Sequence, residues 1–349
     1  MAAPFVLLAT AVLGACSDAG PQGPEDPGTP DPDPDPGYLM AHFTGEHADG
    51  EQVYFATSRD GLHWTDLNDS RPVLISTVGE RGVRDPALIR SPGGDRYWIV
   101  ATDLRIASGK GWGAAANDGS TSLVVWESTD LVDWSGPRLV DVASPIPEAG
   151  CAWAPEAIHD EARGDYVVYW ATISPRDGVT KARIWYARTP DFRTFSEPEL
   201  YIDRPGEQGI IDTRIADAHD GAGEPGDGPR YVRVSNDGQI TFEGADSLLG
   251  TWTRLGDLAH AGLTGADVEG PLLFPFHDGG WGLYVDRYAT GDGYLPLTTT
   301  DLDDPAAFEP LPDSDYDLGA SLKRHGSVLP LSARELARVE ERWKAATDG

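Results

Sequence analysis

The sequence predicts an all-β fold, a five-bladed β-propeller with four strands in each blade. The first observation is a repeat in which an acidic residue or a histidine opens a short apolar strand at five points, with separations of 71, 56, 57 and 56 residues. The five residues are Asp85, Glu156, Asp212, Glu269 and His325. The second observation is a strand-like run, an Asp-containing turn and an aromatic residue, repeated at 54–64, 125–134, 184–195, 240–252 and 297–308. Similar units that follow one another at this period are typical of a propeller.

Hairpin turns supply the remaining strands of each unit. Turns rich in Gly and Asp at 91–95, 160–164 and 277–280 each lead into an apolar run, and the run 231–234 follows a longer loop. Gly-Gly and Asp-Gly pairs between alternating apolar runs indicate hairpins. Each unit is therefore expected to contain four strands.

The fifth blade is predicted to be divided between the two ends of the chain. Residues 325–331 would supply its inner strand and 39–65 its outer three, so that pairing of the N- and C-terminal strands closes the ring and leaves few exposed edges. The first unit is the longest, and we place its insertion at 108–117. Ser332 is expected to cap a final helix over 333–346, with Glu335 completing a capping box.

The charge balance narrows the class of partner. The 349 residues include 57 acidic and 27 basic side chains, a net charge of −30. Nucleic acid is excluded as a partner because phosphate binding needs a basic surface. A neutral or cationic ligand suits this surface, although the acidity also serves solubility alone. We expect a monomer.

The first 37 residues are predicted to be a targeting segment and a tether. Residues 4–13 are apolar but too short to span a bilayer, and the Leu-Gly-Ala-Cys run that ends at Cys16 resembles a bacterial lipobox, whose Cys is lipidated. We therefore predict a lipoprotein signal peptide over 1–16, with an ordinary secretory signal as the alternative. The Pro/Asp-rich stretch 17–37 is expected to be a disordered linker. The protein is expected to be exported and lipid-anchored to the bacterial cell membrane, or secreted, with its folded catalytic domain over 38–349.

The other cysteine, Cys151, lies between Gly150 and Ala152 in an apolar run. If Cys16 is lipidated, Cys151 is unpaired, so no disulfide framework is expected. A buried thiol that packs as a small apolar group fits this setting better than a nucleophile.

The five repeated residues are the candidate functional site. The innermost strand of each blade lies beside the propeller axis, so residues at one position in every inner strand form a ring. Pro86 is expected to hold Asp85 in an extended conformation at the mouth of its strand. Neighbouring carboxylates raise each other's pKa, which is costly unless they have a role. They would either cap strands, hold calcium on the axis, or catalyse glycoside hydrolysis, which needs one protonated acid and one carboxylate that activates water.

From Tyr38 to about Leu331 the sequence resembles glycoside hydrolase family 43, a five-bladed propeller family in one clan with family 62. Arg84-Asp85-Pro86 is similar to the family's first-blade Asp-Pro, which implies that Asp85 is the general base. Glu269-Gly270-Pro271 is similar to its Glu-Gly-Pro, which implies that Glu269 is the general acid.

The resemblance extends to the other three blades. Ile211-Asp212-Thr213 stands where the family has Ile-Asp-Pro, which implies that Asp212 orients the acid and raises its pKa. Trp153-Ala154-Pro155-Glu156 is similar to a second-blade motif outside the catalytic trio, so Glu156 is assigned to the pocket wall as a substrate-binding residue. Arg324-His325-Gly326 is similar to a segment whose His helps to hold a water-coordinated cation, which implies a calcium or sodium ion on the axis. No cofactor is required for the reaction.

Four further residues are weaker candidates for substrate binding. Trp153 and Trp112 could stack on a sugar, although aromatic residues in β-rich chains more often belong to the core. Arg287 and Tyr288 follow a strand of the fourth blade and could reach a sugar hydroxyl.

The expected function is that of an inverting exo-glycosidase that releases terminal sugars, α-L-arabinofuranose above all, from plant or microbial polysaccharides. β-Xylosidase, β-galactofuranosidase and endo-arabinanase activities occur in the same family and remain alternatives. A non-catalytic carbohydrate-binding propeller and a structural surface lipoprotein are alternatives from other classes.

Overall fold

The structure is a computed structural model that describes Met1 and residues 36–220 and 228–344. Apart from Met1, the predicted signal peptide with its Cys16 lies outside the described residues. So does all of the predicted linker except its last two residues. None of the helices in the described part of the chain combines the length and apolar character needed to cross a bilayer.

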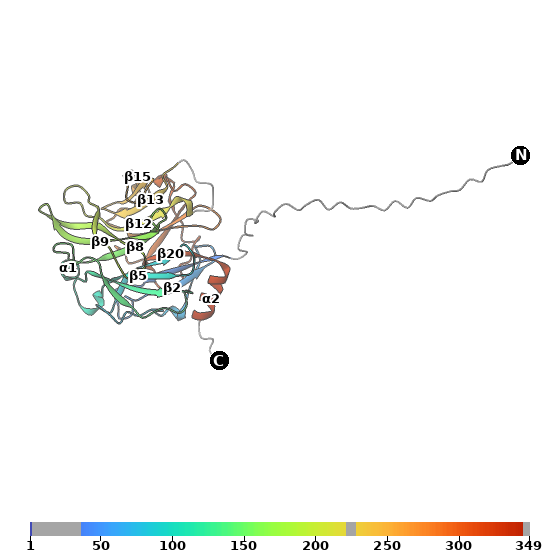
Figure 1. Ribbon diagram of the computed structural model, residues 1–349, viewed down its shortest axis with the longest axis horizontal. Helices are drawn as coiled ribbons and strands as arrows, with labels where there is room; N and C mark the ends of the chain where they lie inside the picture. Colours follow the sequence, from blue (N-terminus) through green and yellow to red (C-terminus); the bar gives the residue numbers. More distant parts are fainter. Residues whose placement is uncertain (2–35, 221–227, 345–349) are drawn as a thin grey trace. The chain divides into compact units, whose positions relative to one another are not determined.

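Five four-stranded antiparallel sheets follow one another in chain order (Figure 1), and the inner strand of each sheet contacts the inner strands of its two neighbours, so that the sheets close into a ring. The predicted five-bladed propeller is confirmed. We number the blades in chain order and give their strands from the inside outward. Blade 1 contains β4 (Val83–Arg90), β5 (Tyr97–Asp103), β6 (Ser122–Ser128) and β7 (Arg138–Asp141). Blade 2 contains β8 (Trp153–Asp160), β9 (Asp165–Arg176), β10 (Val179–Thr189) and β11 (Glu199–Ile202).

The other three blades repeat this order. Blade 3 contains β12 (Ile211–Asp217), β13 (Tyr231–Asn236), β14 (Ile240–Ala245) and β15 (Thr253–Asp257). Blade 4 contains β16 (Glu269–Pro275), β17 (Trp281–Asp286), β18 (Tyr294–Thr299) and β19 (Glu309–Pro310). Blade 5 contains β20 (Arg324–Leu331), β1 (Gly37–Phe43), β2 (Tyr54–Ser58) and β3 (Trp64–Asp66). The pairing of β1 with β20 closes the ring as predicted, and β1 begins at Gly37, one residue inside the predicted linker.

Helices are short and lie between or after the strands. The predicted insertion in blade 1 contains α1 (Trp112–Asn117), and α2 (Ala333–Trp343) lies against blade 5 (Figure 1). The predicted capping box is present at Ser332 and Glu335. The helix ends at Trp343, earlier than the predicted residue 346. The 3-10 helices are η1 (Asn68–Ser70), η2 (Ile106–Ser108), η3 (Ala218–Asp220), η4 (Ala259–Ala261) and η5 (Pro305–Ala307).

The core is divided into five apolar clusters, one at each interface between neighbouring blades. Side chains alternate between the two faces of a strand: in β13, Tyr231 packs toward blade 2 and Val232 toward blade 4. Each blade is therefore apolar on both faces, and burying both of them positions the inner strands around the axis. Cys151 is buried, as predicted, and burial raises the pKa of its thiol to about 12.

Each inner strand contains a β-bulge, a point at which two of its residues lie opposite one residue of the neighbouring strand. In blades 1 to 4 the first bulged residue has a left-handed backbone, with φ between 47° and 55°; these residues are Asp85, Ala154, Asp212 and Gly270. The expectation that Asp85 is extended is wrong: its φ is 51°. The extra residue has to leave the ladder, and this requirement outweighs the preference that Pro86 imposes on it.

The bulges also correct the expected ring. Aligned on the bulge, Asp85, Asp212 and His325 occupy one position, as predicted. Glu269 lies one residue before that position, and Glu156 lies two residues after it. The prediction that all five share one position is therefore wrong for these two, because motif spacing does not show where a bulge interrupts the pairing.

Candidate active site

Three side chains at the bulge position meet at the axis. Nδ1 of His325 lies 3.3 Å from Oδ1 of Asp85 and 3.9 Å from Oδ1 of Asp212. All three side chains are at most 12% exposed. Burial alone would lower the pKa of His325, but Asp212, Asp85 and Glu269 outweigh it and raise the pKa to about 10. The imidazole is therefore a cation at neutral pH, and the two carboxylates share it.

Asp85 is held by a hydrogen bond that links two blades. The Thr102 hydroxyl donates to Oδ2 of Asp85 at 2.7 Å, and the same hydroxyl accepts the backbone N–H of Ala154 in blade 2 at 2.8 Å. Burial alone would raise the pKa of Asp85, but the charge and hydrogen bond of His325 lower it below its usual value. Asp85 is thus an ionised carboxylate with a fixed orientation, as a general base must be.

Asp212 links blades 3 and 4. Its Oδ2 accepts the backbone N–H of Gly270 at 3.0 Å, so it lies beside Glu269, the residue before that glycine. Burial raises the pKa of Asp212, and the charge of Asp85 adds to this effect while His325 opposes it. Gly270 has a left-handed φ of 55°, and a Cβ at this position would lie 2.6 Å from the ring of His325. Both facts explain why a glycine occupies this position.

Glu269 differs electrostatically from Asp85. Burial raises its pKa to about 8, and the charges of Asp212 and Asp286 contribute further, against His325 and Arg324. The side chain is 23% exposed, the most accessible of the four groups in this cluster. At neutral pH Glu269 is a protonated acid with access to a ligand, while Asp85 is an anion.

Arg324 was not among the predicted site residues. Its Nη2 lies 3.2 Å from Oε1 of Glu269, and its Nε lies 2.9 Å from Oδ2 of the fully buried Asp286. Its Nη1 also reaches Glu46 at 3.1 Å, and Arg84 contacts the same carboxylate at 2.6 Å. Arg324 and Arg84 both stand directly before the bulge, the position that Glu269 occupies in blade 4. The sequence signal for these two arginines was that each directly precedes a repeated site residue, in Arg-Asp-Pro and in Arg-His-Gly.

Few side chains around His325 could coordinate the predicted axial cation. Nδ1 of His325 is engaged by Asp85, which leaves Nε2 as the nitrogen that could bind a hydrated ion. Among the described residues no three His, Cys, Asp or Glu side chains are arranged to hold a metal. An ion coordinated directly by a set of protein side chains does not fit this donor set. An ion held through water by His325 stays a prediction.

Glu156, the predicted wall residue, lies two residues after the bulge position of blade 2. Its Oε2 is 2.5 Å from Nη1 of Arg214, and its side chain is 7% exposed. Burial raises the pKa of Glu156, and the charges of Arg214 and His325 oppose the shift. The structure thus places it beneath the cluster, in an ion pair, rather than at an open surface.

The two aromatic candidates, Trp112 and Trp153, form a rim beside Arg84. Trp112 is 49% exposed, its ring centroid is 6.2 Å from that of Trp153, and the guanidinium of Arg84 lies 4.9 Å from the Trp112 ring. Trp153 is only partly buried, so it is neither a core residue nor fully accessible. Trp112 therefore presents an exposed aromatic face beside Arg84, the residue before Asp85, which suits stacking on a sugar.

The two substrate-binding candidates of blade 4, Tyr288 and Arg287, differ in the groups that surround their side chains. Tyr288 is 38% exposed. Burial raises the pKa of its hydroxyl, and the charges of Glu269, Asp267 and Asp212 raise it further, so the hydroxyl lies toward these acids. That hydroxyl donates to the Ala266 carbonyl at 2.9 Å. Arg287 instead donates to the carbonyls of its own loop, at Gly293, Asp292 and Tyr294.

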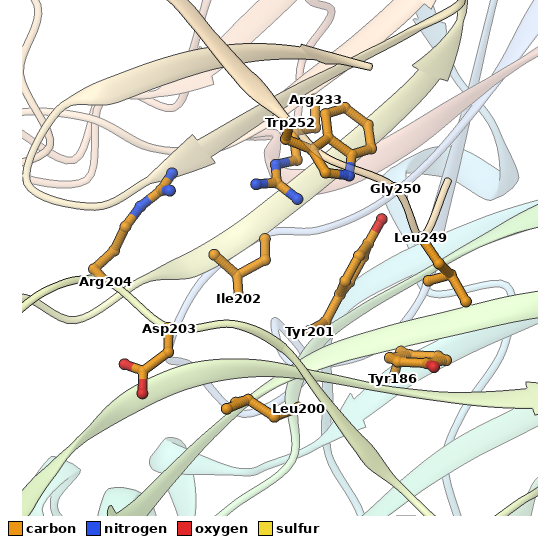
Figure 2. Close-up of a pocket in the computed structure, with 10 residues that line it drawn as sticks. All are labelled: Tyr186, Leu200, Tyr201, Ile202, Asp203, Arg204, Arg233, Leu249, Gly250 and Trp252. Carbon is orange, nitrogen blue, oxygen red and sulfur yellow. The ribbon is translucent and has the colours of Figure 1, made fainter. Parts of the chain in front are cut away.

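A separate groove of about 370 Å³ lies between blades 2 and 3, lined by Tyr201, Arg204, Arg233 and Trp252 among others (Figure 2). Its two guanidinium groups both contact Glu243, at 2.7 Å and 2.8 Å. Burial alone would raise the pKa of Glu243, but hydrogen bonds from Arg204 and Arg233 lower it to about 2. Arg204 also pairs with Asp237 at 2.8 Å. Glu243 is therefore ionised at neutral pH, in contrast to Glu269 at the axis.

The fold and the axial cluster define a five-bladed propeller with an ionised and a protonated carboxyl group at one end of its axis, the arrangement that hydrolysis of a glycosidic bond requires. Residues 33–337 match the family described as a probable glycosyl hydrolase domain, related to glycosyl hydrolase family 43, and the chain belongs to this family. It is thus a glycoside hydrolase domain.

Three similar proteins show how far the likeness extends. An α-L-arabinofuranosidase from Bifidobacterium longum subsp. longum is 31% identical over 188 residues, which are 49% of this chain and 18% of that protein. The chain thus spans less than a fifth of the length of that relative. A thermostable family-43 glycoside hydrolase structure is 18% identical, with 69% of this chain and 76% of that chain covered and a TM-score of 0.44. An endo-1,4-beta-xylanase structure from Bacteroides thetaiotaomicron is 15% identical, with 84% and 92% covered and a TM-score of 0.48.

Proposed function

We propose that this protein is an inverting glycosidase that removes terminal α-L-arabinofuranose from plant or microbial polysaccharides. The single observation that carries the proposal is the opposite shift of two carboxyl groups at one end of the axis: the pKa of Glu269 is raised to about 8, while that of Asp85 is lowered. Two carboxyl groups whose environments separate their pKa values can act as acid and base at the same pH.

In the proposed reaction Glu269 donates its proton to the glycosidic oxygen as the bond to the anomeric carbon breaks. Asp85 accepts a proton from a water molecule, whose oxygen bonds to the anomeric carbon from the opposite face of the sugar, so its configuration inverts. Glu269 is left ionised and Asp85 protonated, and exchange with solvent restores both. Asp212 is a positioning residue, because it holds the backbone beside Glu269 and raises the pKa of the acid.

The rim would bind the sugar. Trp112 presents its ring next to Arg84, and Tyr288 lies on the side of Glu269, so the two could contact a sugar ring from different blades. Arabinofuranose is proposed because the matched relative is an α-L-arabinofuranosidase. The carboxyl groups serve β-xylosides, β-galactofuranosides and internal arabinan bonds equally well, so these substrates are the alternatives to be tested.

The proposal is tested with p-nitrophenyl α-L-arabinofuranoside, β-D-xyloside and β-D-galactofuranoside, and with polymeric arabinan for endo action. Glu269→Gln removes the acid. Glu309→Gln, at an exposed position of the outermost strand in the same blade, is the matched control. We expect turnover of the arabinofuranoside that Glu269→Gln abolishes and Glu309→Gln preserves. Binding of a glycan without turnover of any substrate would indicate a carbohydrate-binding propeller instead.

We also propose that the chain is exported and anchored through Cys16. The support is the lipobox-like run before this cysteine and the Pro/Asp-rich stretch after it. Inhibition of lipoprotein signal peptidase should leave the precursor uncleaved in a producing bacterium. Normal cleavage under inhibition would indicate an ordinary secretory signal.

A further inference from the structure

Arg214 places a guanidinium group on the propeller axis. From blade 3, its Nη1 contacts Glu156 of blade 2 at 2.5 Å, and its Nε donates to the Leu273 carbonyl of blade 4 at 3.3 Å. Blades 2 and 4 lie on opposite sides of blade 3, so a group that contacts both inner strands lies where the blades converge. The Arg214 side chain is 18% exposed.

The ion pair lies between the catalytic cluster and a second cavity. This cavity, of about 480 Å³, is lined by the inner strands of all five blades and by Arg214. Its apolar wall includes Ile89, Ile158, Ile215 and Leu329, all of which follow the bulge position by three or more residues. Because the five inner strands begin at the catalytic end, the cavity lies toward the other end, with the Glu156–Arg214 pair between the two.

Glu156 and Arg214 occupy equivalent positions in neighbouring blades, two residues after the bulge position. The other three blades have Ala87, Leu272 and Ser327 there. This level of the axis thus contains one anion and one cation. Burial alone would lower the pKa of Arg214, but the charge of Glu156 outweighs it, so the guanidinium stays charged.

We propose that Arg214 is the chain's own axial cation. Its pair with Glu156 separates the catalytic cluster from the second cavity and makes the fold independent of a bound metal ion. The guanidinium neutralises Glu156 beneath His325, where the family resemblance implied calcium or sodium. A buried charge left without its partner is strongly destabilising, whereas loss of both charges is tolerated far better. The pair should therefore behave as one unit. This proposal does not depend on which sugar, if any, the protein hydrolyses.

The wild-type chain gives the first test. Its thermal midpoint is measured after dialysis against EDTA, then with calcium chloride or sodium chloride added, with choline chloride as the control for ionic strength. We expect the midpoint to stay within about 2 °C throughout, because no bound ion shifts the folding equilibrium. A midpoint that falls with EDTA and recovers with calcium would overturn the proposal.

The second test is a double-mutant cycle with Arg214→Met, Glu156→Gln and the double variant. We expect Arg214→Met to lower the midpoint by several degrees and to gain stability from added calcium or sodium, since Glu156 then lacks its counter-ion. The double variant should lose less than the sum of the two single losses and should show no response to cations. Additive losses would contradict the proposal. If Arg214→Met does not fold, the double variant is still expected to fold, and its failure would count against the proposal.

Arg188→Met is the matched control. Arg188 is 12% exposed and pairs with Asp160 at 2.6 Å and with Asp165, both at strand ends within blade 2. Its loss should lower the midpoint without creating a cation response. A cation response here equal to that of Arg214→Met would show that any broken ion pair produces it, and would remove the case for an axial role.

Discussion

Glu269 at the axis and Glu243 in the groove between blades 2 and 3 are the same residue type in two buried settings with opposite outcomes. Glu243 meets two guanidinium groups, and these overcome the effect of burial to lower its pKa to about 2. Glu269 contacts one guanidinium group, that of Arg324. Burial and the charges of Asp212 and Asp286 raise its pKa to about 8, against the charges of His325 and Arg324. Direct hydrogen bonds from two guanidinium groups in one case, and neighbouring carboxylates in the other, give these two buried glutamates opposite pKa shifts.

The largest expected difference follows from replacing each glutamate by glutamine. Glu269→Gln should lower kcat about 10²–10⁴-fold with little change in thermal midpoint, because a proton donor is lost while the shape is kept. Glu243→Gln should keep its activity but lose stability, on the order of 3–5 kcal/mol, because the buried Arg233 loses its anion and Arg204 keeps only Asp237. Turnover and thermal unfolding of both variants check this. Equal loss of stability in the two would contradict the comparison.

Asp85 tests the other half of the acid–base pair. Asp85→Ala should also lower kcat about 10²–10⁴-fold, because the attacking water loses its base. Azide needs no deprotonation, so it should restore part of the turnover and form a glycosyl azide of inverted configuration. A loss of activity that comes with unfolding, and that azide does not restore, would favour a structural role for this carboxylate.

The pH profile sharpens the account of how the pKa of Glu269 is set. Activity should fall as the pH rises through about 8, because the acid loses its proton. Asp212→Asn removes a charge that raises this pKa, so the alkaline limb should move to lower pH. Arg324→Met removes a charge that lowers it, so the limb should move to higher pH. The limbs are measured in kcat/KM, and shifts in the same direction would exclude this electrostatic explanation.

The smallest expected effect is on stability in acid. The pKa of Glu243 is depressed in the folded state to about 2, so its contribution is present above its unfolded value of about 4.3 and is lost as the pH falls toward 2. The thermal midpoint of the wild type should therefore fall more steeply between pH 5 and pH 2 than that of Glu243→Gln. Parallel curves would show that Glu243 does not titrate with a depressed pKa.

Much of the fold could be predicted because its signals are local. The repeat spacing, the Gly and Asp turns, and the Ser332–Glu335 capping box are read from a few neighbouring residues, and all are present in the structure. The bulges could not be predicted, because an extra residue is defined only by its pairing with another strand. For that reason Glu269 and Glu156 were assigned to the wrong level.

The cations of the site also escaped prediction. Arg214 is the only basic residue of β12, and its partner Glu156 lies 58 residues earlier. Arg324 stands beside His325 in a motif that was noticed, but its contacts with Glu269 and Asp286 depend on how blades 4 and 5 meet. The acidic residues recur in four of the five blades, whereas an arginine directly before the bulge recurs only at Arg84 and Arg324, and Arg214 lies at another position.

The most direct test of the central claim is the pKa of Glu269 itself. Carboxyl carbons of glutamate labelled with ¹³C are titrated by NMR in the wild type and in Glu269→Gln, and the resonance absent from the variant belongs to Glu269. The account predicts that this resonance titrates at about 8. A midpoint near the ordinary glutamate value of about 4.3 would contradict it, because Glu269 would then be ionised at neutral pH and could not act as the acid.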